Sequence, residues 1–555
     1  IVGLMMGAIF SVITAIGATA PTATATQTVV GTDLPVSSTV GFVVGMPITG
    51  TNIPANTIIA AVNANSLTLN TATTVLAVAG VTGTKSVTVS NAVTGTLAGS
   101  ALTFGNAYNG GTLINGGTLV IRDNFSLGNV GDAVTVASGA TLDFGGSLTA
   151  NALNLGTRIV TIAGAGVGGN GAIVNSGGFG QINAVQALVL SGDASIGGTQ
   201  RWDFRGPASA TLALNEYTLT KTGSNYIALA NADVSLGNLV VNGGTLEVAG
   251  STTSILAGVL ANTNNATITI NTGATLLLNG TSSFSFTRDL VMAGGTLIST
   301  NLASSIGSNA LLSAPTVMNT NGSDLTLTGV VSGSGLLSKV GGNTLNLNGI
   351  NTFTGGLTVS AGIVATNNDA SFGTGTVTLP SGGTGRVNLA GGFTYTNNFV
   401  IGSGAGQANV TGNVGLGLIN HAGSGRATIT GSLSVLNLTS AGGMLLGGAL
   451  GNELVLAGPI SIAAGVDLPI RLGNVIMSGG GDVSGANIRV QQGNLFAGAN
   501  EGIPAHTKLD LGGSGAAVLD LAGFNQTLSA LTKGAQAATV TNSVAGGVTS
   551  TLSLD

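Results

Sequence analysis

The densest run of chemically capable side chains is the stretch RWDFR, which spans residues 201–205 and contains the single tryptophan of the chain. An aromatic ring beside arginine and aspartate can bind a sugar, because the ring stacks on the sugar while the charged groups hold its polar atoms. Arg201, Trp202 and Asp203 are therefore a candidate sugar contact. Strand alternation offers another interpretation, which we favour. In it Trp202 and Phe204 face inward, while both arginines and Asp203 face outward and neutralise each other.

The other residues do not suggest a catalytic constellation. Polysaccharide lyases and glycosidases need clustered carboxylates, or an arginine or lysine base, on one face. The 19 acidic residues of this chain are scattered instead. Neither His421 nor His506 has a patterned acid or serine beside it, and we expect both histidines at the surface. We therefore expect that the protein is not an enzyme, and a polysaccharide-active enzyme is the least favoured alternative.

Metal, cofactor and nucleic-acid sites are also not expected. Cysteine is absent, which excludes a disulfide framework, a thiolate zinc site and a cysteine nucleophile. The stretch GGGDVSGAN, residues 479–487, is similar to a glycine- and aspartate-rich calcium repeat, but it occurs once, without the iteration that would line up ligands. The net charge of −5 is spread thinly, so there is no basic patch for a phosphate backbone.

The composition indicates which elements carry these side chains. Of the 555 residues, 93 are glycine and only 6% are charged, whereas about 25% are charged in a typical soluble protein. Hydrophobic residues make up 43%, so the chain can form a core. Thr, Val, Ile and Leu dominate between the glycines, which favours short strands joined by tight turns. The composition therefore predicts an all-β protein.

Repeated phrases indicate how these strands are organised. The stretch VTVASGATLDF, residues 134–144, matches ITINTGATLLL, residues 268–278, as strand, glycine turn and strand. A second pair, LTKTGSNYIAL at 219–229 and LSKVGGNTLNL at 337–347, places Lys221 and Lys339 at the same position. Strand–turn units that recur over hundreds of residues are typical of a solenoid, in which each coil buries its apolar face against its neighbours. We expect coils of roughly 20–25 residues with an aliphatic interior and glycine corners.

The stretch from Gly329 to Leu379 resembles the autotransporter-associated β-strand repeat, through phrases such as GLLSKVGG and NTFTGGLTVSAG. The stretches at 192–206 and 519–531 resemble other phrases of such passengers. The resemblance covers most of residues 96–555 and implies a right-handed parallel β-helix outside a bacterial cell. It also implies export through a C-terminal outer-membrane barrel. No run of strands with aromatic girdles closes this sequence, so we expect a barrel outside it or another export route.

The residues before the repeats form two further predicted regions. Residues 21–95 read as a linker and a small β module, with a hairpin over Ile58–Val62 and Leu67–Leu69. Residues 1–20 carry no charge and match a membrane span in length. Their large apolar side chains need a cover from their own domain, a membrane or a neighbouring subunit, and we favour a subunit. The predicted assembly interface comprises Ile1, Val2, Leu4, Met5, Met6, Ile9, Phe10, Ile13 and Ile16.

These observations favour a structural subunit of an extracellular bacterial fibre or surface assembly, whose copies associate end to end. Open solenoid ends present strand edges that a second copy can cover, and a head-to-tail contact that does not close produces filaments. The alternative is a monomeric autotransporter passenger that acts as an adhesin or stalk. Expected partners are copies of the chain, and a host or neighbouring-cell surface or its glycans.

Overall fold

The computed structural model describes most residues from 110 onward and short segments before them. The described residues are 13–14, 29–36, 44, 48–49, 57–75, 86–93, 103–104 and 110–555, without 125, 129–130, 236, 251–265, 281–284, 287, 404–418, 422–424, 438–445, 449–451 and 484. The chain divides into two compact units, Ile1–Glu247 and Val248–Asp555. This division falls within the repeats, and the predicted boundary between residues 95 and 96 stays a prediction.

The first unit contains a small sheet, which includes the hairpin predicted from the sequence. Its strands, in spatial order, are β2 (Val29–Pro35), β6 (Ser86–Val93), β5 (Ser66–Val75) and β4 (Ile59–Val62). Strands β4 and β5 pair antiparallel, with Val62 opposite Leu67. The backbone N–H of Asn63 donates to the carbonyl of Ser66 over 2.8 Å and closes the turn. A separate two-stranded pair joins β3 (Ile48–Thr49) to β7 (Thr103–Phe104).

Parallel coils make up the rest of the described first unit. One ladder runs through β8 (Thr112–Ile114), β10 (Val134–Val136), β12 (Ile159–Gly164) and β15 (Ala187–Gly198). A second ladder runs through β9 (Gly117–Val120), β11 (Ala140–Asp143), β13 (Ile173–Asn175), β15, β17 (Thr218–Lys221) and β19 (Asn238–Val241). A third joins β14 (Gln181–Val185), β16 (Trp202–Ala213) and β18 (Tyr226–Val234), and β18 pairs in turn with β20 (Gly244–Gly250). Each coil is thus hydrogen-bonded to the coil before and the coil after it.

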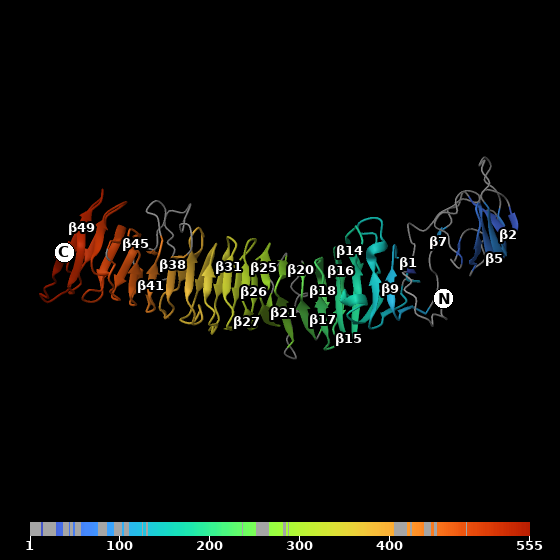
Figure 1. Cartoon of the computed structure of the whole chain (residues 1–555), viewed down its shortest axis with the longest axis horizontal. Coiled ribbons are helices and arrows are strands. Elements are labelled where there is room, and N and C mark those ends of the chain that lie inside the picture. Colours follow the sequence, from blue (N-terminus) through green and yellow to red (C-terminus); the bar gives the residue numbers. More distant parts are fainter. Residues whose placement is uncertain are drawn as a thin grey trace. The chain divides into compact units, whose positions relative to one another are not determined.

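The second unit repeats this arrangement, and Figure 1 shows β25, β31, β38, β41 and β45 following one another in chain order. One ladder runs through β21 (Thr267–Asn271), β24 (Asp289–Ala293), β27 (Ala310–Ala314) and β30 (Val331–Gly333). The next contains β22 (Ala274–Gly280), β25 (Thr296–Thr300), β28 (Thr316–Asn319), β31 (Leu337–Val340), β33 (Leu357–Val359), β35 (Val377–Pro380), β38 (Phe399–Ser403), β41 (Leu433–Val435) and β44 (Ile460–Ile462).

Further parallel ladders complete the second unit. One contains β23 (Ser285–Phe286), β26 (Ser304–Ile306), β29 (Leu325–Leu327), β32 (Thr344–Leu347), β34 (Ile363–Thr366), β36 (Arg386–Leu389), β39 (Ile419–His421) and β42 (Leu446–Gly448). Another contains β37 (Thr394–Tyr395), β40 (Arg426–Ile429) and β43 (Glu453–Leu456). Both lead into β45 (Asp467–Met477) and β46 (Asn487–Ala497), which are followed by β47 (Thr507–Leu511), β48 (Ala517–Asp520), β49 (Gln526–Lys533), β50 (Ala538–Thr541) and β51 (Leu552–Leu554).

The interior is a set of aliphatic columns, as the alternation of apolar residues predicts. One column in the second unit contains, at equivalent positions of successive coils, Leu337, Leu357, Val377, Phe399, Leu433 and Ile460. None of these side chains is more than 2% exposed. Because each strand alternates between faces, the residues between these positions point away from the core. The fold is therefore an all-β parallel solenoid with an apolar interior.

The corners also follow the sequence pattern. Gly139 and Gly273, which occupy the same position in the two matching phrases, have φ of +83° and +79°, where a side chain would be strained. Amide side chains connect successive coils, and Asn494 Nδ2 donates to Asn474 Oδ1 over 2.8 Å. The two matching sequence phrases thus have the same backbone conformation at their glycine corners.

Candidate functional site

Trp202 and Phe204 lie in the interior, on the inward face of β16. Both side chains are fully buried. The Trp202 ring meets Phe144 edge-on at 5.5 Å between centroids, and its Nε1 donates to the carbonyl of Gly197 over 2.9 Å. A sugar cannot stack on this ring without opening the coil, because both the face and the polar edge of the indole are occupied. The structure therefore confirms the prediction that Trp202 faces inward.

Asp203 points to the opposite side of β16, yet its side chain is also fully buried. Arg201 donates to it from Nε and from Nη2, the latter over 2.8 Å, and the backbone N–H of Ala228 donates over 3.0 Å. The Nη2 of Arg205 lies 3.7 Å away. Burial raises the pKa of the Asp203 carboxyl above its ordinary value, and the hydrogen bonds from Arg201 oppose this shift. Asp203 therefore acts as an internal anchor for Arg201.

Arg201 is the centre of a wider polar cluster that also contains Tyr226 and Glu247. Its guanidinium lies 4.5 Å above the centre of the Tyr226 ring, and its Nη2 is 3.6 Å from the carboxylate of the buried Glu247. Burial, with a hydrogen bond to Glu247, raises the pKa of the Tyr226 hydroxyl. The cluster balances two arginines with two carboxylates, and only the arginines are substantially exposed, at 38% and 35%. The cluster therefore keeps its carboxylates paired in the interior and its guanidinium groups partly at the surface.

Two lysines occupy interior positions. Lys221 and Lys339 are at most 1% exposed, and both lie on the inward face of their strands. The Nζ of Lys221 donates to the carbonyls of Thr222, Gly223 and Gly243, each over 2.9 Å. All three N–H groups of the ammonium are thus satisfied by carbonyls at a coil corner.

The second lysine repeats this arrangement. The Nζ of Lys339 donates to the carbonyls of Val340, Gly341 and Ala361 over 2.8–3.0 Å. Burial lowers the pKa of each lysine to about 8. The repeated lysine of the two phrases is therefore a structural cation. Its role is not evident from the sequence, although the alternation from Leu219 and Leu337 is consistent with its inward position.

Two arginines are buried in the same manner. Arg158 is 1% exposed and donates to the carbonyls of Leu127 and Gly128 over 2.6 and 3.1 Å. Arg288 is fully buried, and burial lowers its pKa to about 10. Together with the lysines, four basic residues among those that the structure describes lie in the interior. Arg158 and both lysines donate hydrogen bonds to backbone carbonyl oxygens.

The prediction that both histidines lie at the surface is wrong for His421. This residue is 1% exposed, because it shares the inward face of β39 with Ile419, and its Nε2 donates to the carbonyl of Gly425 over 2.7 Å. His506 is partly exposed, as expected. However, the fold brings two acids to it, with Asp482 at 3.3 Å and Asp555 at 3.0 Å. Sequence spacing could not show these contacts, since each partner comes from another coil.

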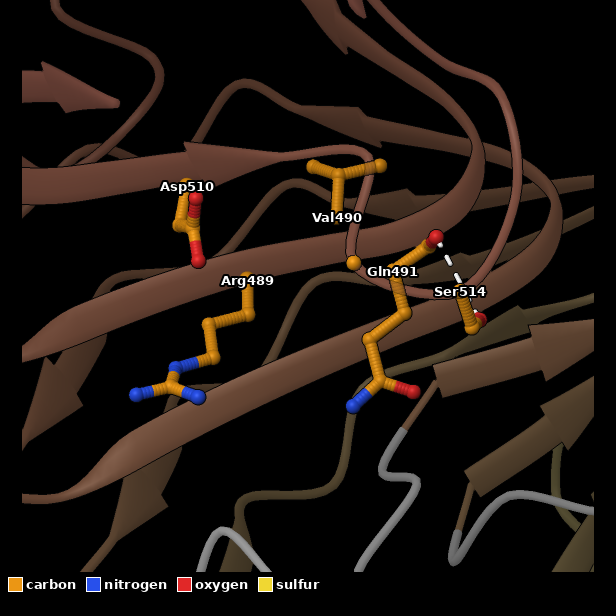
Figure 2. Close-up of a pocket in the computed structure, with 6 residues that line it drawn as sticks. Arg489, Val490, Gln491, Asp510 and Ser514 are labelled. Atoms are coloured by element: carbon orange, nitrogen blue, oxygen red, sulfur yellow. Dashed lines mark hydrogen bonds between the residues drawn. The ribbon is translucent and has the colours of Figure 1, made fainter. Parts of the chain in front are cut away.

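A shallow hollow of about 210 Å³ lies on the outer side of β46 and β47. Figure 2 shows Arg489, Gln491, Asp510 and Ser514 around it. Arg489 is held by Asp467 at 3.1 Å, and the backbone N–H of Ser514 donates to the carbonyl of Gln491 over 2.9 Å. The lining mixes polar and apolar surface, is open and has no aromatic ring, so it provides no enclosed binding site.

Other predicted site residues can be placed only in part. Ile13 lies in the short strand β1 (Ile13–Thr14), which pairs in parallel with β9, and the remaining residues of the predicted assembly interface lie outside the described residues. Within the ranges that the structure describes, no helix has the length and apolar character needed to cross a membrane. In the same ranges, no group of three or more His, Cys, Asp or Glu side chains could hold a metal ion.

The described residues form a parallel β-solenoid. Several of its charged side chains hydrogen-bond to the backbone of the coils. No family model, curated protein or solved structure matches the chain. The likeness to autotransporter repeats therefore depends on the quoted phrases alone.

Proposed function

We propose that this protein is a structural subunit of an extracellular bacterial fibre or surface assembly, in which copies stack end to end. A β-solenoid is consistent with a structural or surface protein, since stacked coils provide a stiff scaffold. The resemblance of residues 329–379 to autotransporter repeats supports an extracellular location. A charged fraction of only 6% supports close contact between copies, because little charge repulsion opposes it.

The observation that carries this proposal is the exposed apolar face of the last described coil. Val540 continues the interior column of Leu495 and Leu519, which are fully buried, yet Val540 is 44% exposed. Leu554 pairs with Leu528 in the same way, and the two are 59% and 0% exposed. These side chains have the orientation of core residues, so a further coil of the same shape would bury them.

The turn between β50 and β51 contains two further exposed valines. Val544 and Val548 are 37% and 49% exposed. Burying each large aliphatic side chain stabilises a contact by roughly 1.5–3 kcal/mol. We propose that, when copies stack end to end, a coil of a second copy covers these side chains. A head-to-tail contact of this kind uses different surfaces on the two copies and can continue without closing.

Lysine substitutions in this face test the proposal. Val540→Lys with Leu554→Lys places charges in the apolar contact while leaving every internal coil unchanged. We expect the wild type to sediment as oligomers whose size grows with concentration, and the double variant to sediment as a monomer. Ile350→Lys is the matched control, since Ile350 is 70% exposed on a lateral surface. A monomeric wild type, or equal dissociation of the control, would contradict the proposal.

Deletion of residues 1–20 tests the other half of the contact. We expect the shortened protein to lose polymerisation while its β-sheet circular-dichroism signal is retained. If the wild type remains a monomer and binds cell surfaces in that state, the alternative role as an adhesin or stalk would replace the fibre.

A further inference from the structure

Arg205 presents a partly exposed guanidinium at the edge of this cluster, 3.7 Å from Asp203. Arg205 is 35% exposed in its side chain, and no hydrogen bond from its guanidinium is found among the described residues. Its nearest acid, Asp203, already receives hydrogen bonds from Arg201 and from a backbone N–H, and its side chain is fully buried. A carboxylate arriving from solvent would therefore meet the donors of Arg205 with little competition.

An exposed aromatic ring lies in the loop before β14, which is hydrogen-bonded to Arg201 at the start of β16. Phe179 is 45% exposed in the loop between β13 and β14, and its carbonyl is fixed by Asn175 Nδ2 over 2.9 Å. The backbone N–H of Gln181 donates to the carbonyl of Arg201, which places this loop beside Arg201. The loop is thus held in place by hydrogen bonds while the Phe179 side chain remains accessible.

We propose that Phe179, Arg201, Arg205 and Tyr226 form a lateral binding strip for an acidic polysaccharide. The ring of Phe179 packs against the apolar face of a pyranose, and Arg205 pairs with the carboxylate of a uronic acid unit. Arg201 keeps its hydrogen bonds to Asp203 and its contact with the Tyr226 ring, and so fixes the position of these side chains. The strip goes beyond the structural role proposed above and does not depend on it.

An extended glycan fits this surface better than a peptide does. Strand β16 pairs with β14 on one edge and with β18 on the other. A peptide therefore cannot add a strand here, which is the main way in which peptides bind to β-structure. A row of exposed side chains on a coil stack is suited to an extended polymer that makes several separate contacts. The partial positive charge of the exposed edge favours an acidic polymer over a neutral one.

The test compares variants for binding to an oligogalacturonate, with a neutral maltooligosaccharide of equal length as the second probe. Phe179→Ala and Arg205→Gln remove the ring and the exposed guanidinium, while the Arg201–Asp203 pair stays intact. We expect each variant to weaken binding about five- to tenfold, and the double variant to abolish it. Binding of the wild type should also weaken with added salt, because the contact is partly ionic and exposed.

The matched control is Tyr217→Ala with Arg426→Gln, which removes an exposed ring and an exposed guanidinium elsewhere on the protein. We expect its affinity to equal that of the wild type. Circular dichroism checks that all variants are folded, and Phe179→Ala alone suffices if the arginine variant is not. No binding of the wild type to oligogalacturonate, equal binding of the neutral probe, or equal loss in the control would overturn the proposal.

Discussion

At the scale of single residues, the few charges of this chain are placed where the backbone needs them. Lys221 and Lys339 each satisfy three carbonyls at a corner, and Asp203 holds Arg201. Asp369, the one charge between residues 351 and 379, accepts the backbone N–H of Thr394 in the next coil over 2.5 Å. Charged side chains therefore connect coils.

The buried lysines predict an unusual dependence of stability on pH. The ordinary lysine pKa of 10.5 falls to about 8 in the folded state, so between these values the unfolded chain binds more protons than the folded chain. Stability should therefore rise between about pH 8 and pH 10, by up to about 1.4 kcal/mol per pH unit for each lysine. We expect Lys339→Met to reduce this slope, measured as the denaturant midpoint at each pH. An unchanged slope in the variant would contradict the assignment.

The same substitution has a second expected effect at neutral pH. Lys339→Met leaves three buried carbonyls without their donor, which costs about 1–3 kcal/mol of unfolding free energy. The exposed Lys508→Met is the matched control, since Lys508 lies on an outer face, and we expect little change in its midpoint. Destabilisation of both variants to the same extent would point to a general charge effect.

Asp369 allows a prediction for the contacts between coils. Asp369→Ala removes the acceptor for Thr394 and should lower the unfolding free energy by about 0.5–1.5 kcal/mol. Asp369→Asn keeps an oxygen at the same position and should lose less. The comparison of these two variants by denaturant titration separates the hydrogen bond from the charge. A larger loss in the asparagine variant would show that charge, and not the backbone contact, is what matters.

At the scale of elements, glycine corners determine where each coil turns. Gly362 has φ of +69°, and a Cβ there would lie 2.3 Å from the carbonyl oxygen of Gly341 and 2.7 Å from Nζ of Lys339. Gly273 has a similar φ of +79° but open space around it. Gly273→Ala should cost about 1–2 kcal/mol through backbone strain alone. Gly362→Ala should cost clearly more, and equal thermal shifts in the two variants would contradict this account.

The sequence predicted the strands and turns well, because their periodicity is local. Alternation placed Trp202 inward, and matching phrases located Gly139 and Gly273 at equivalent corners. The burial of His421 was missed, although its parity with Ile419 on β39 was visible, because histidine is usually exposed. The full burial of Asp203 could not be predicted, since it depends on residues of the neighbouring coils.

At the scale of the whole molecule, both proposed functions use exposed surfaces of the solenoid. Val540 and Leu554 have the orientation of core residues and the exposure of surface residues. The proposed fibre uses these residues, whereas the proposed glycan strip around Phe179 and Arg205 lies on a lateral face. The two roles use separate residues, so variants in one surface should leave the other function intact.

Cryo-electron microscopy of the purified wild-type protein tests the central claim most directly. We expect filaments whose axial repeat equals one chain, with Val540 and Leu554 buried in the contact between copies. Single unassociated particles at high protein concentration, or filaments joined only through lateral faces, would contradict it.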